Sequence, residues 1–269
     1  MANNIITIQN LNFSFKDKTI FQDINLTIQE GSFISLMGPN GTGKSTLIKI
    51  ISGLLPYDGY ISICGYYLNN ENINKIRRTL GVVLDEIDNQ FIGETVKDDL
   101  AFNLENLEYQ KDEIEKEINN ISLLFNLKNV LDKDPLTLDE STKQTVTIAS
   151  SLIHKPRILL LDESFQHLNK KDKETVIKAL SYYQKEYNLT IILITHNEED
   201  TLYSSRLIIL NKSKIYLDDT PLNIYKNPKQ IKNLGMEVPF IIKLSHNLEL
   251  YNLTDKLHLT IESLVDELW

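Results

Sequence analysis

The sequence predicts an α/β protein with a mainly parallel core sheet covered by helices. Two observations support this fold class. Apolar runs of strand length alternate with segments of helical period along the 269 residues, and several of these runs end in polar residues, as strands of a parallel sheet do where they carry ligand groups. Strands are expected at 5–8, 24–28, 33–37, 82–84, 158–161, 191–194 and 207–210, with a hairpin partner at 214–217.

Helical segments separate and follow these strands. Helices are expected to begin at Lys44, Asn74, Gln110, Ser141, Lys171 and Glu198. Between about 86 and 153 the strand runs disappear and the pattern becomes helical and polar, which predicts a helical subdomain inserted into the sheet domain. After Pro221 the chain turns helical again, with breakers at Pro228, Gly235 and Pro239.

The composition limits the functions that this chain can have. Its 37 acidic and 28 basic residues give a net charge of −9, the sign opposite to that of proteins that coat nucleic acid, so no nucleic-acid partner is expected. Cys64 is the only cysteine, which excludes an intrachain disulfide and a cysteine zinc site. No signal-peptide pattern and no apolar run approaching 18 residues is found, so any membrane role is expected to come through partners.

A glycine-rich loop follows the strand expected at 33–37. It reads Gly38-Pro39-Asn40-Gly41-Thr42-Gly43-Lys44-Ser45-Thr46 and leads directly into a helix, which is the G-x-x-x-x-G-K-[ST] pattern in its strand–loop–helix context. Glycines let successive backbone N–H groups curl around a phosphate, at the positive end of the next helix. Lys44 is expected to reach the β- and γ-phosphates and Ser45 to bind Mg²⁺. The weaker alternative is a glycine-rich turn with an incidental lysine.

Two further apolar strands end in polar residues. The first ends in Asp162 and Glu163, and the second ends in Thr195 and His196. Beside a phosphate loop, Asp162 is expected to order the Mg²⁺ shell and Glu163 to polarise the water that attacks the γ-phosphate. His196 is expected to sense the γ-phosphate from the same sheet edge. A solvated acidic turn and a structural histidine are the alternatives.

These three motifs, in this order and with a helical insertion between them, resemble the ATP-binding cassette (ABC) ATPases. The resemblance implies a P-loop NTPase fold with an added N-terminal antiparallel β subdomain, and it implies ATP and Mg²⁺ as ligands. It also places Phe15 where the family stacks an aromatic ring on adenine; a core strand phenylalanine is the alternative. Two blocks resemble more narrowly the ATPase subunits of energy-coupling factor transporters, which drive uptake of vitamins and metal ions: the residues around 88–106 and the tail at 235–240 and 262–268.

The sequence departs from the family pattern at three places. The family signature Leu-Ser-Gly-Gly-Gln is degenerate and reads Leu138-Asp139-Glu140-Ser141-Thr142. Two carboxylates therefore lie where the family cradles the γ-phosphate of the opposite subunit, although Asp139 is also a good helix N-cap. Asp85 replaces the glutamine that contacts Mg²⁺ and water; it can still bind the metal through oxygen but lacks the amide donor. Asn169 replaces the aspartate that follows the two Walker carboxylates.

The resemblance implies an ATPase subunit bound peripherally at the cytoplasmic face of the membrane. We expect an ABC ATPase domain over 5–238 and a C-terminal helical extension over 239–269. The expected partners are a second ATPase subunit with an intact signature, a transmembrane coupling subunit and a substrate-binding membrane component. The alternatives are an ATP-binding but hydrolysis-impaired regulatory subunit and a soluble ABC ATPase that has no transport role.

Overall fold

The computed structural model describes residues 3–269, and over these residues the chain forms two sheets. The strands are β1 (Asn4–Phe15), β2 (Lys18–Gln29), β3 (Phe33–Met37), β4 (Asp58–Ile63), β5 (Tyr66–Tyr67), β6 (Leu80–Val83), β7 (Ile158–Asp162), β8 (Thr190–Ile194), β9 (Arg206–Asn211) and β10 (Lys214–Asp219). One sheet is antiparallel with the order β2-β1-β4-β5, and the other has the order β10-β9-β3-β8-β7-β6. In the second sheet every pair is parallel except β9 with β10, so the predicted mainly parallel core sheet is confirmed.

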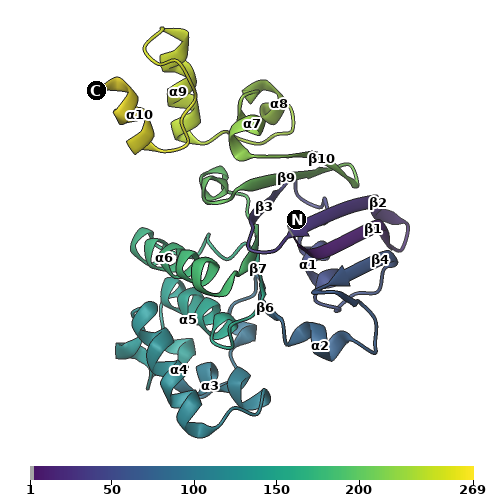
Figure 1. Ribbon diagram of the computed structural model, residues 1–269, viewed down its shortest axis with the longest axis vertical. Coiled ribbons are helices and arrows are strands. Elements are labelled where there is room, and N and C mark those ends of the chain that lie inside the picture. The colour runs from purple at the N-terminus through teal and green to yellow at the C-terminus, as the bar shows by residue number, and fades with distance from the viewer. Residues whose placement is uncertain (1–2) are drawn as a thin grey trace.

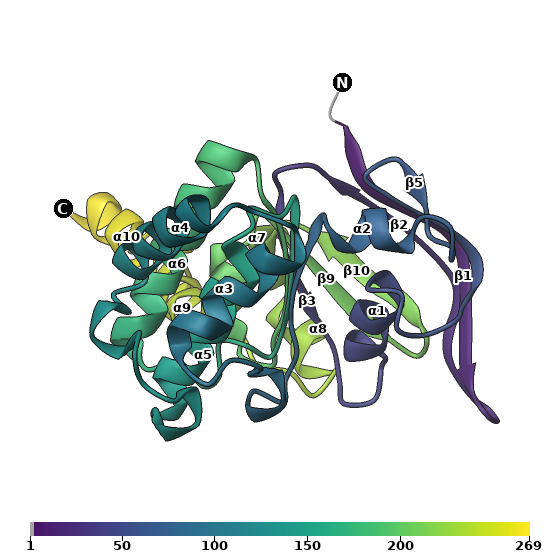
Figure 2. The same ribbon diagram turned by 90° about the horizontal axis from the view of Figure 1, so that it is seen from below.

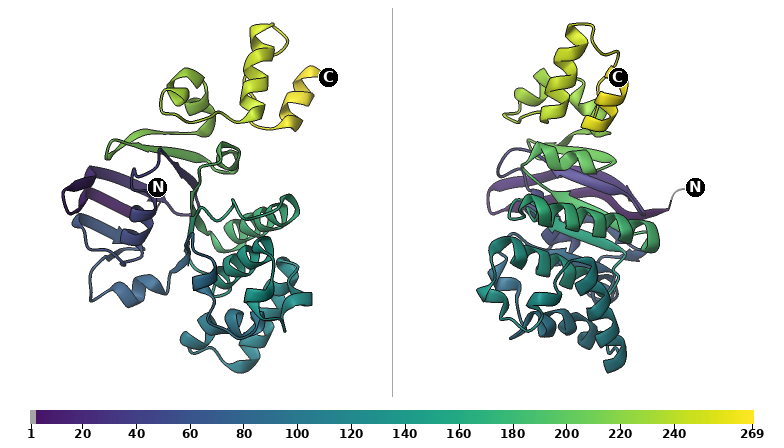
Figure 3. Two further views of the ribbon diagram at one scale, coloured as in Figure 1. Left: turned by 180° about the vertical axis from the view of Figure 1, so that it is seen from behind. Right: turned by 90° about the vertical axis from the view of Figure 1, so that its left-hand side faces the viewer.

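Helices surround this sheet. They are α1 (Lys44–Ile51), α2 (Ile73–Arg77), α3 (Val96–Asn106), α4 (Lys111–Leu124), α5 (Glu140–Leu152), α6 (Lys170–Tyr187), α7 (Pro221–Tyr225), α8 (Pro228–Lys232), α9 (Phe240–Leu250) and α10 (Ile261–Leu268). Helices α3 to α5 lie at one end of the molecule and α9 and α10 at the opposite end, with the antiparallel sheet to one side (Figure 1). Figure 2, from below, shows α1 between the two sheets, and Figure 3 shows the C-terminal helices beyond β10.

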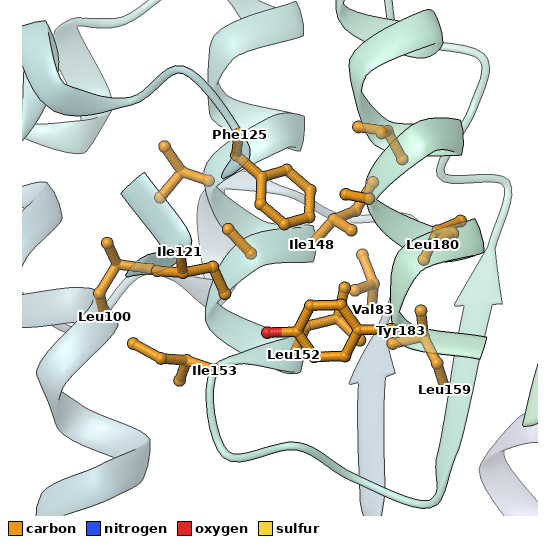
Figure 4. Close-up of a cluster of buried hydrophobic side chains, with 14 of the residues drawn as sticks. Val83, Leu100, Ile121, Phe125, Ile148, Leu152, Ile153, Leu159, Leu180 and Tyr183 are labelled. Carbon is orange, nitrogen blue, oxygen red and sulfur yellow. The ribbon is translucent and has the colours of Figure 1, made fainter. Parts of the chain in front are cut away.

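Three apolar cores hold these layers together. The strands β3, β7 and β8 are buried along their whole length, as expected for strands covered on both faces. One core joins β6, β7 and β8 to helices α3 to α6 (Figure 4). The second packs α1 between the antiparallel sheet and the parallel sheet. The third joins the outer part of the parallel sheet to α7, α8, α9 and α10. Together the cores fix the carboxyl ends of β3, β7 and β8.

The structure also corrects several predicted elements. The helix predicted from Glu198 is a short 3-10 helix, Glu198–Tyr203, that ends before the extended Ser204. The strands β4 and β5 were not predicted, because Gly59 interrupts the apolar pattern of β4 and β5 has only two residues. The predicted hairpin at 214–217 is confirmed: β9 and β10 pair across a two-residue turn with positive φ at both positions, which is the tight turn that antiparallel strands favour.

Candidate nucleotide-binding site

The glycine-rich loop wraps the end of β3 and the start of α1. Gly43 caps α1 with a φ of 100°, and a Cβ atom there would lie 2.5 Å from Ile20 Cγ2. A Cβ atom on Gly38 would lie 2.3 Å from the carbonyl oxygen of Leu210. Both positions therefore require glycine, for its conformation and for its small size. The loop keeps the backbone N–H groups at the N-terminus of α1 clear of side chains, as a phosphate site needs.

Lys44 and Ser45 point toward the carboxylates at the end of β7. The ammonium group of Lys44 donates to the carbonyl oxygen of Gly38 at 2.9 Å. The Ser45 hydroxyl donates to Asp162 Oδ1 at 3.1 Å. Burial lowers the pKa of Lys44, and the charges of Glu163 and Asp162 oppose that shift. Burial raises the pKa of Asp162, while the Ser45 hydrogen bond opposes the rise. The sequence thus brings a cation, a hydroxyl and a carboxylate together within one site.

Glu163 and His196 lie side by side at the ends of β7 and β8. Glu163 has a φ of 52°, a left-handed conformation that only a small share of non-glycine residues adopt. One carboxylate oxygen accepts a hydrogen bond from the His196 backbone N–H at 3.2 Å, and the other lies 3.0 Å from His196 Nε2. Burial lowers the pKa of His196, and the Lys44 charge adds to this shift. The lowered pKa favours the neutral imidazole, whose Nε2–H can donate to the Glu163 carboxylate.

Burial also raises the pKa of Glu163, and the charge of Lys44 opposes the rise. A carboxylate with a raised pKa beside an open cavity is suited to accept a proton from water. The cavity has a volume of about 440 Å³ and is lined by Asn40, Gly41, Gly43, Lys44, Ser45, Thr46, Asp85, Glu163, Gln166 and His196. The cavity is thus lined by predicted residues of the phosphate loop together with Asp85, Glu163 and His196.

The structure places Asp85 and Gln166 together at the rim of this cavity. Gln166 Nε2 donates to Asp85 Oδ1 at 3.0 Å. The sequence identified Asp85 as a departure from the family pattern but gave Gln166 no role. Its only signal is position: Gln166 lies three residues beyond Glu163, within the turn that leaves the carboxyl end of β7.

The degenerate signature, residues 138–142, forms the N-terminus of α5, and its side chains make different contacts. Asp139 caps the helix and accepts hydrogen bonds from the Thr142 backbone N–H at 3.0 Å and from the Thr142 hydroxyl at 2.7 Å. These bonds, the hydroxyl's first, lower the pKa of Asp139, so its carboxylate is ionised. Ser141 is buried and donates to Asp172 on α6 at 2.5 Å. Glu140 is exposed, and Leu138 packs against the core.

Phe15 lies outside the residues that line the cavity. It ends β1, is 50% exposed, and meets Phe13 edge to face with ring centroids 4.7 Å apart. The side chain of Lys18, which begins β2 three residues after Phe15, comes close to the phosphate loop, since a Cβ atom on Gly41 would lie 3.5 Å from Lys18 Nζ. The exposed ring is not a core residue, which removes the structural alternative that the sequence left open.

The donor set fits a magnesium ion that is bound together with phosphate. Within residues 3–269, no group of three or more His, Cys, Asp and Glu side chains is arranged to hold a metal. Ser45 and Asp162 instead offer two oxygen donors beside the phosphate loop. Mg²⁺ is characteristically held by one or two protein oxygens together with phosphates and water, and when bound it neutralises charge on the phosphates.

Comparison with known proteins assigns this site to a family. Residues 21–166 match the family model described as ABC transporter. The chain is 35% identical over 246 residues to the energy-coupling factor transporter ATP-binding protein EcfA1 of Leuconostoc mesenteroides, covering 90% of both chains. It is also similar to cbiO1 of Clostridium perfringens, part of the ABC transporter complex cbiONQ, with 27% identity, a TM-score of 0.77 and coverage of 92% of this chain and 99% of that one. The dimeric ATP-binding cassette MJ0796 bound to ADP and Pi has 25% identity, a TM-score of 0.72 and coverage of 80% and 98%.

The chain therefore belongs to the ABC transporter family, with the P-loop NTPase fold that this family shares. Within that family it groups with the ATP-binding proteins of energy-coupling factor transporters. It is an ATPase whose ligands are ATP and Mg²⁺. No helix of the described part of the chain is both long and apolar enough to cross a membrane.

Proposed function

We propose that this chain is the ATP-binding subunit of an energy-coupling factor importer and drives uptake of a vitamin or metal ion. One observation carries the proposal: Lys44, Ser45, Glu163 and His196 line one cavity, and Asp162 is hydrogen-bonded to Ser45 beside it, as nucleotide binding and hydrolysis require. The subunit binds at the cytoplasmic face of the membrane through a transmembrane coupling subunit and serves a substrate-binding membrane component. The similarity to an EcfA1 protein over 90% of the chain supports this assembly.

In the proposed reaction, each of the chain's own groups has one role. Lys44 and the loop amides bind the β- and γ-phosphates, Ser45 and Asp162 hold the magnesium ion, and Phe15 stacks on adenine. Glu163 accepts a proton from the attacking water, and His196 orients Glu163 through Nε2–H. The raised pKa of Glu163, which follows from its burial, suits that proton transfer.

The functional dimer is an asymmetric pair with a second ATPase subunit that carries an intact signature. In a homodimer the ionised Asp139 would face the γ-phosphate at both sites, and like charges repel there. In the heterodimer this chain's Lys44 and Glu163 form the working site with the partner's signature. The same observations leave a second candidate: a subunit that binds ATP but contributes no turnover of its own.

ATPase assays of the purified chain, alone and with its partner subunit, test the proposal. We expect low activity alone and high activity in the complex. Lys44→Ala should abolish nucleotide binding at this site. Full activity of the isolated chain would contradict the asymmetric pair, and unchanged activity of the complex when the partner's carboxylate is replaced would exclude the regulatory candidate.

The division of the chain into domains is part of the same proposal. An ATPase domain over 5–238 includes a helical subdomain at about 86–153, and a C-terminal helical extension covers 239–269. Support comes from the place of α3 to α5 at one end of the molecule (Figure 1) and of α9 and α10 at the opposite end (Figure 3).

A further inference from the structure

Gln166 and Asp85 form a pair that the family pattern does not contain. Asp85 follows β6, and Gln166 lies in the turn after β7, a neighbouring strand of the same sheet. Both side chains are exposed at the rim of the phosphate cavity, which they line together with Glu163 and Lys44. Their hydrogen bond of 3.0 Å crosses from one strand end to the next. The pair therefore belongs to the nucleotide site by position.

The hydrogen bonds of Gln166 fix the orientation of its amide. Asp85 offers only acceptor oxygens when ionised, so the amide must turn its NH₂ group toward Asp85. The same Nε2 atom lies 3.0 Å from His167 Nε2. Because the amide nitrogen can only donate, His167 Nε2 is the acceptor and its proton is on Nδ1, on the side of Glu140, whose Oε2 is 3.8 Å away. Both N–H bonds of the Gln166 amide are thus committed.

This arrangement leaves the carbonyl oxygen Oε1 as the group of Gln166 that remains to bind a ligand. No hydrogen bond to Oε1 is formed by any residue within 3–269. Carbonyl and carboxylate oxygens are the ligands that Mg²⁺ prefers. The negative charge of Asp85 also reaches the metal side of the site, since it adds to the larger effect of burial in raising the pKa of both Asp162 and Glu163.

We infer that Gln166 supplies the amide that position 85 lacks, and that its Oε1 contacts the hydrated magnesium ion of bound ATP. The inference rests on the proposed nucleotide site and names a further residue of it. Asp85 acts on this contact as a positioning residue, because it holds the amide nitrogen and so presents the oxygen. The amide that the family pattern carries after β6 is thus supplied from the turn after β7.

The test measures how Mg²⁺ supports ATP binding to the full-length chain. Calorimetric titration of ATP, in EDTA and over a series of Mg²⁺ concentrations, gives the Mg²⁺ concentration for half-maximal binding. Gln166→Ala should raise that concentration about five- to tenfold, the effect of one polar contact, and leave binding in EDTA unchanged. Asp85→Ala should act in the same direction. The double variant should need no more Mg²⁺ for half-maximal binding than the single variant with the larger increase, because the two residues act as a unit.

A rescue variant and a control variant complete the experiment. Asp85→Gln combined with Gln166→Ala should return the half-maximal Mg²⁺ concentration to within about twofold of wild type, as expected when a contact is restored from the other strand. Gln9→Ala removes an exposed glutamine from β1 and should change nothing.

Unchanged Mg²⁺ dependence in Gln166→Ala, while Lys44→Ala loses ATP binding, would overturn the inference and leave the proposed function intact. If Asp85→Gln combined with Gln166→Ala needs as much Mg²⁺ for half-maximal binding as Gln166→Ala alone, the inference is likewise contradicted. Failure of the wild-type chain to bind ATP with Mg²⁺ would overturn the proposed function and this inference with it.

Discussion

A buried ion pair beneath the site allows a quantitative test of the structure. Lys173 on α6 pairs with Asp200 in the 3-10 helix Glu198–Tyr203, and the side chains are 18% and 1% exposed. The other oxygen of Asp200 accepts from the Thr195 hydroxyl at 3.1 Å. Because Thr195 directly precedes His196, the pair connects α6 to the loop that carries the histidine.

Lys173→Met removes the cation, retains most of the packing of its chain, and leaves a carboxylate with one hydroxyl partner in a buried position. Breaking a buried pair from one side typically costs about 3–5 kcal/mol. The cost is capped, because the carboxyl group can take up a proton instead. An ordinary aspartic acid has a pKa of about 3.9, so its protonation at pH 7 costs roughly 4 kcal/mol. We expect a loss of about 2–4 kcal/mol, since Lys173 is partly exposed and water can enter.

Urea unfolding followed by circular dichroism measures this loss. The difference from wild type should shrink as the pH falls from about 7 to 5, because protonation of the unpaired carboxyl becomes cheaper. Asp200→Asn in the Lys173→Met background should recover part of the loss. Lys171→Met, on the exposed face of α6, is the matched control and should change the free energy of unfolding by less than about 0.5 kcal/mol. A pH-independent loss, or one below about 1 kcal/mol, would refute the argument that an unpaired buried charge is its cause.

Three further predictions follow from single side chains. Glu163→Gln should retain ATP binding and trap a closed dimer of the assembled transporter, seen by gel filtration; unchanged turnover would show that Glu163 is not the catalytic carboxylate. Asp139→Ser should keep helix α5 capped within about 0.5 kcal/mol and raise ATP turnover at the partner's nucleotide site, and an unchanged rate would show that the charge is harmless. Burial lowers the pKa of His154 from its ordinary 6.5, so the unfolded chain gains a proton first and stability falls as the pH drops below about 6.5. His154→Gln should flatten that fall in the free energy of unfolding, measured in urea between about pH 7 and 5.5.

Much of the fold was predictable because its central strands are continuously apolar. The runs in β3, β7 and β8 are buried on both faces, and the run at 207–210 in β9 is buried in the same way. The antiparallel sheet gave weaker signals: β1 has one exposed face and a break at Asn10, which has a positive φ. The residue pattern predicted parts of β1 and β2, at 5–8 and 24–28, and the resemblance to a family supplied their antiparallel arrangement. Short elements such as β5 depend on pairing with a neighbour and have no pattern of their own.

The candidate site also has one part that the sequence predicts and one part that it does not. A phosphate loop must have glycine at Gly38 and Gly43 for steric reasons, so the sequence identifies it directly. Side chains that meet only through the sheet order are different. Asp85 and Gln166 are 81 residues apart and come together because β6 lies beside β7. No pattern in the neighbouring sequence predicts such a pair, because the contact depends on the strand order of the sheet.

The N-terminus of α5 shows how one residue can stabilise the fold and weaken a phosphate contact. A helix N-terminus attracts phosphate through its unpaired N–H groups and its positive dipole end. Asp139 occupies both features. Its carboxylate accepts a hydrogen bond from the Thr142 N–H and places a negative charge at the N-terminus of the helix. Ser141, in the first turn of α5, donates its hydroxyl hydrogen to Asp172 on α6. Two donors that a γ-phosphate could use, the Thr142 N–H and the Ser141 hydroxyl, are thus already satisfied within the chain. Helix capping therefore supports the proposed asymmetric dimer in addition to charge repulsion.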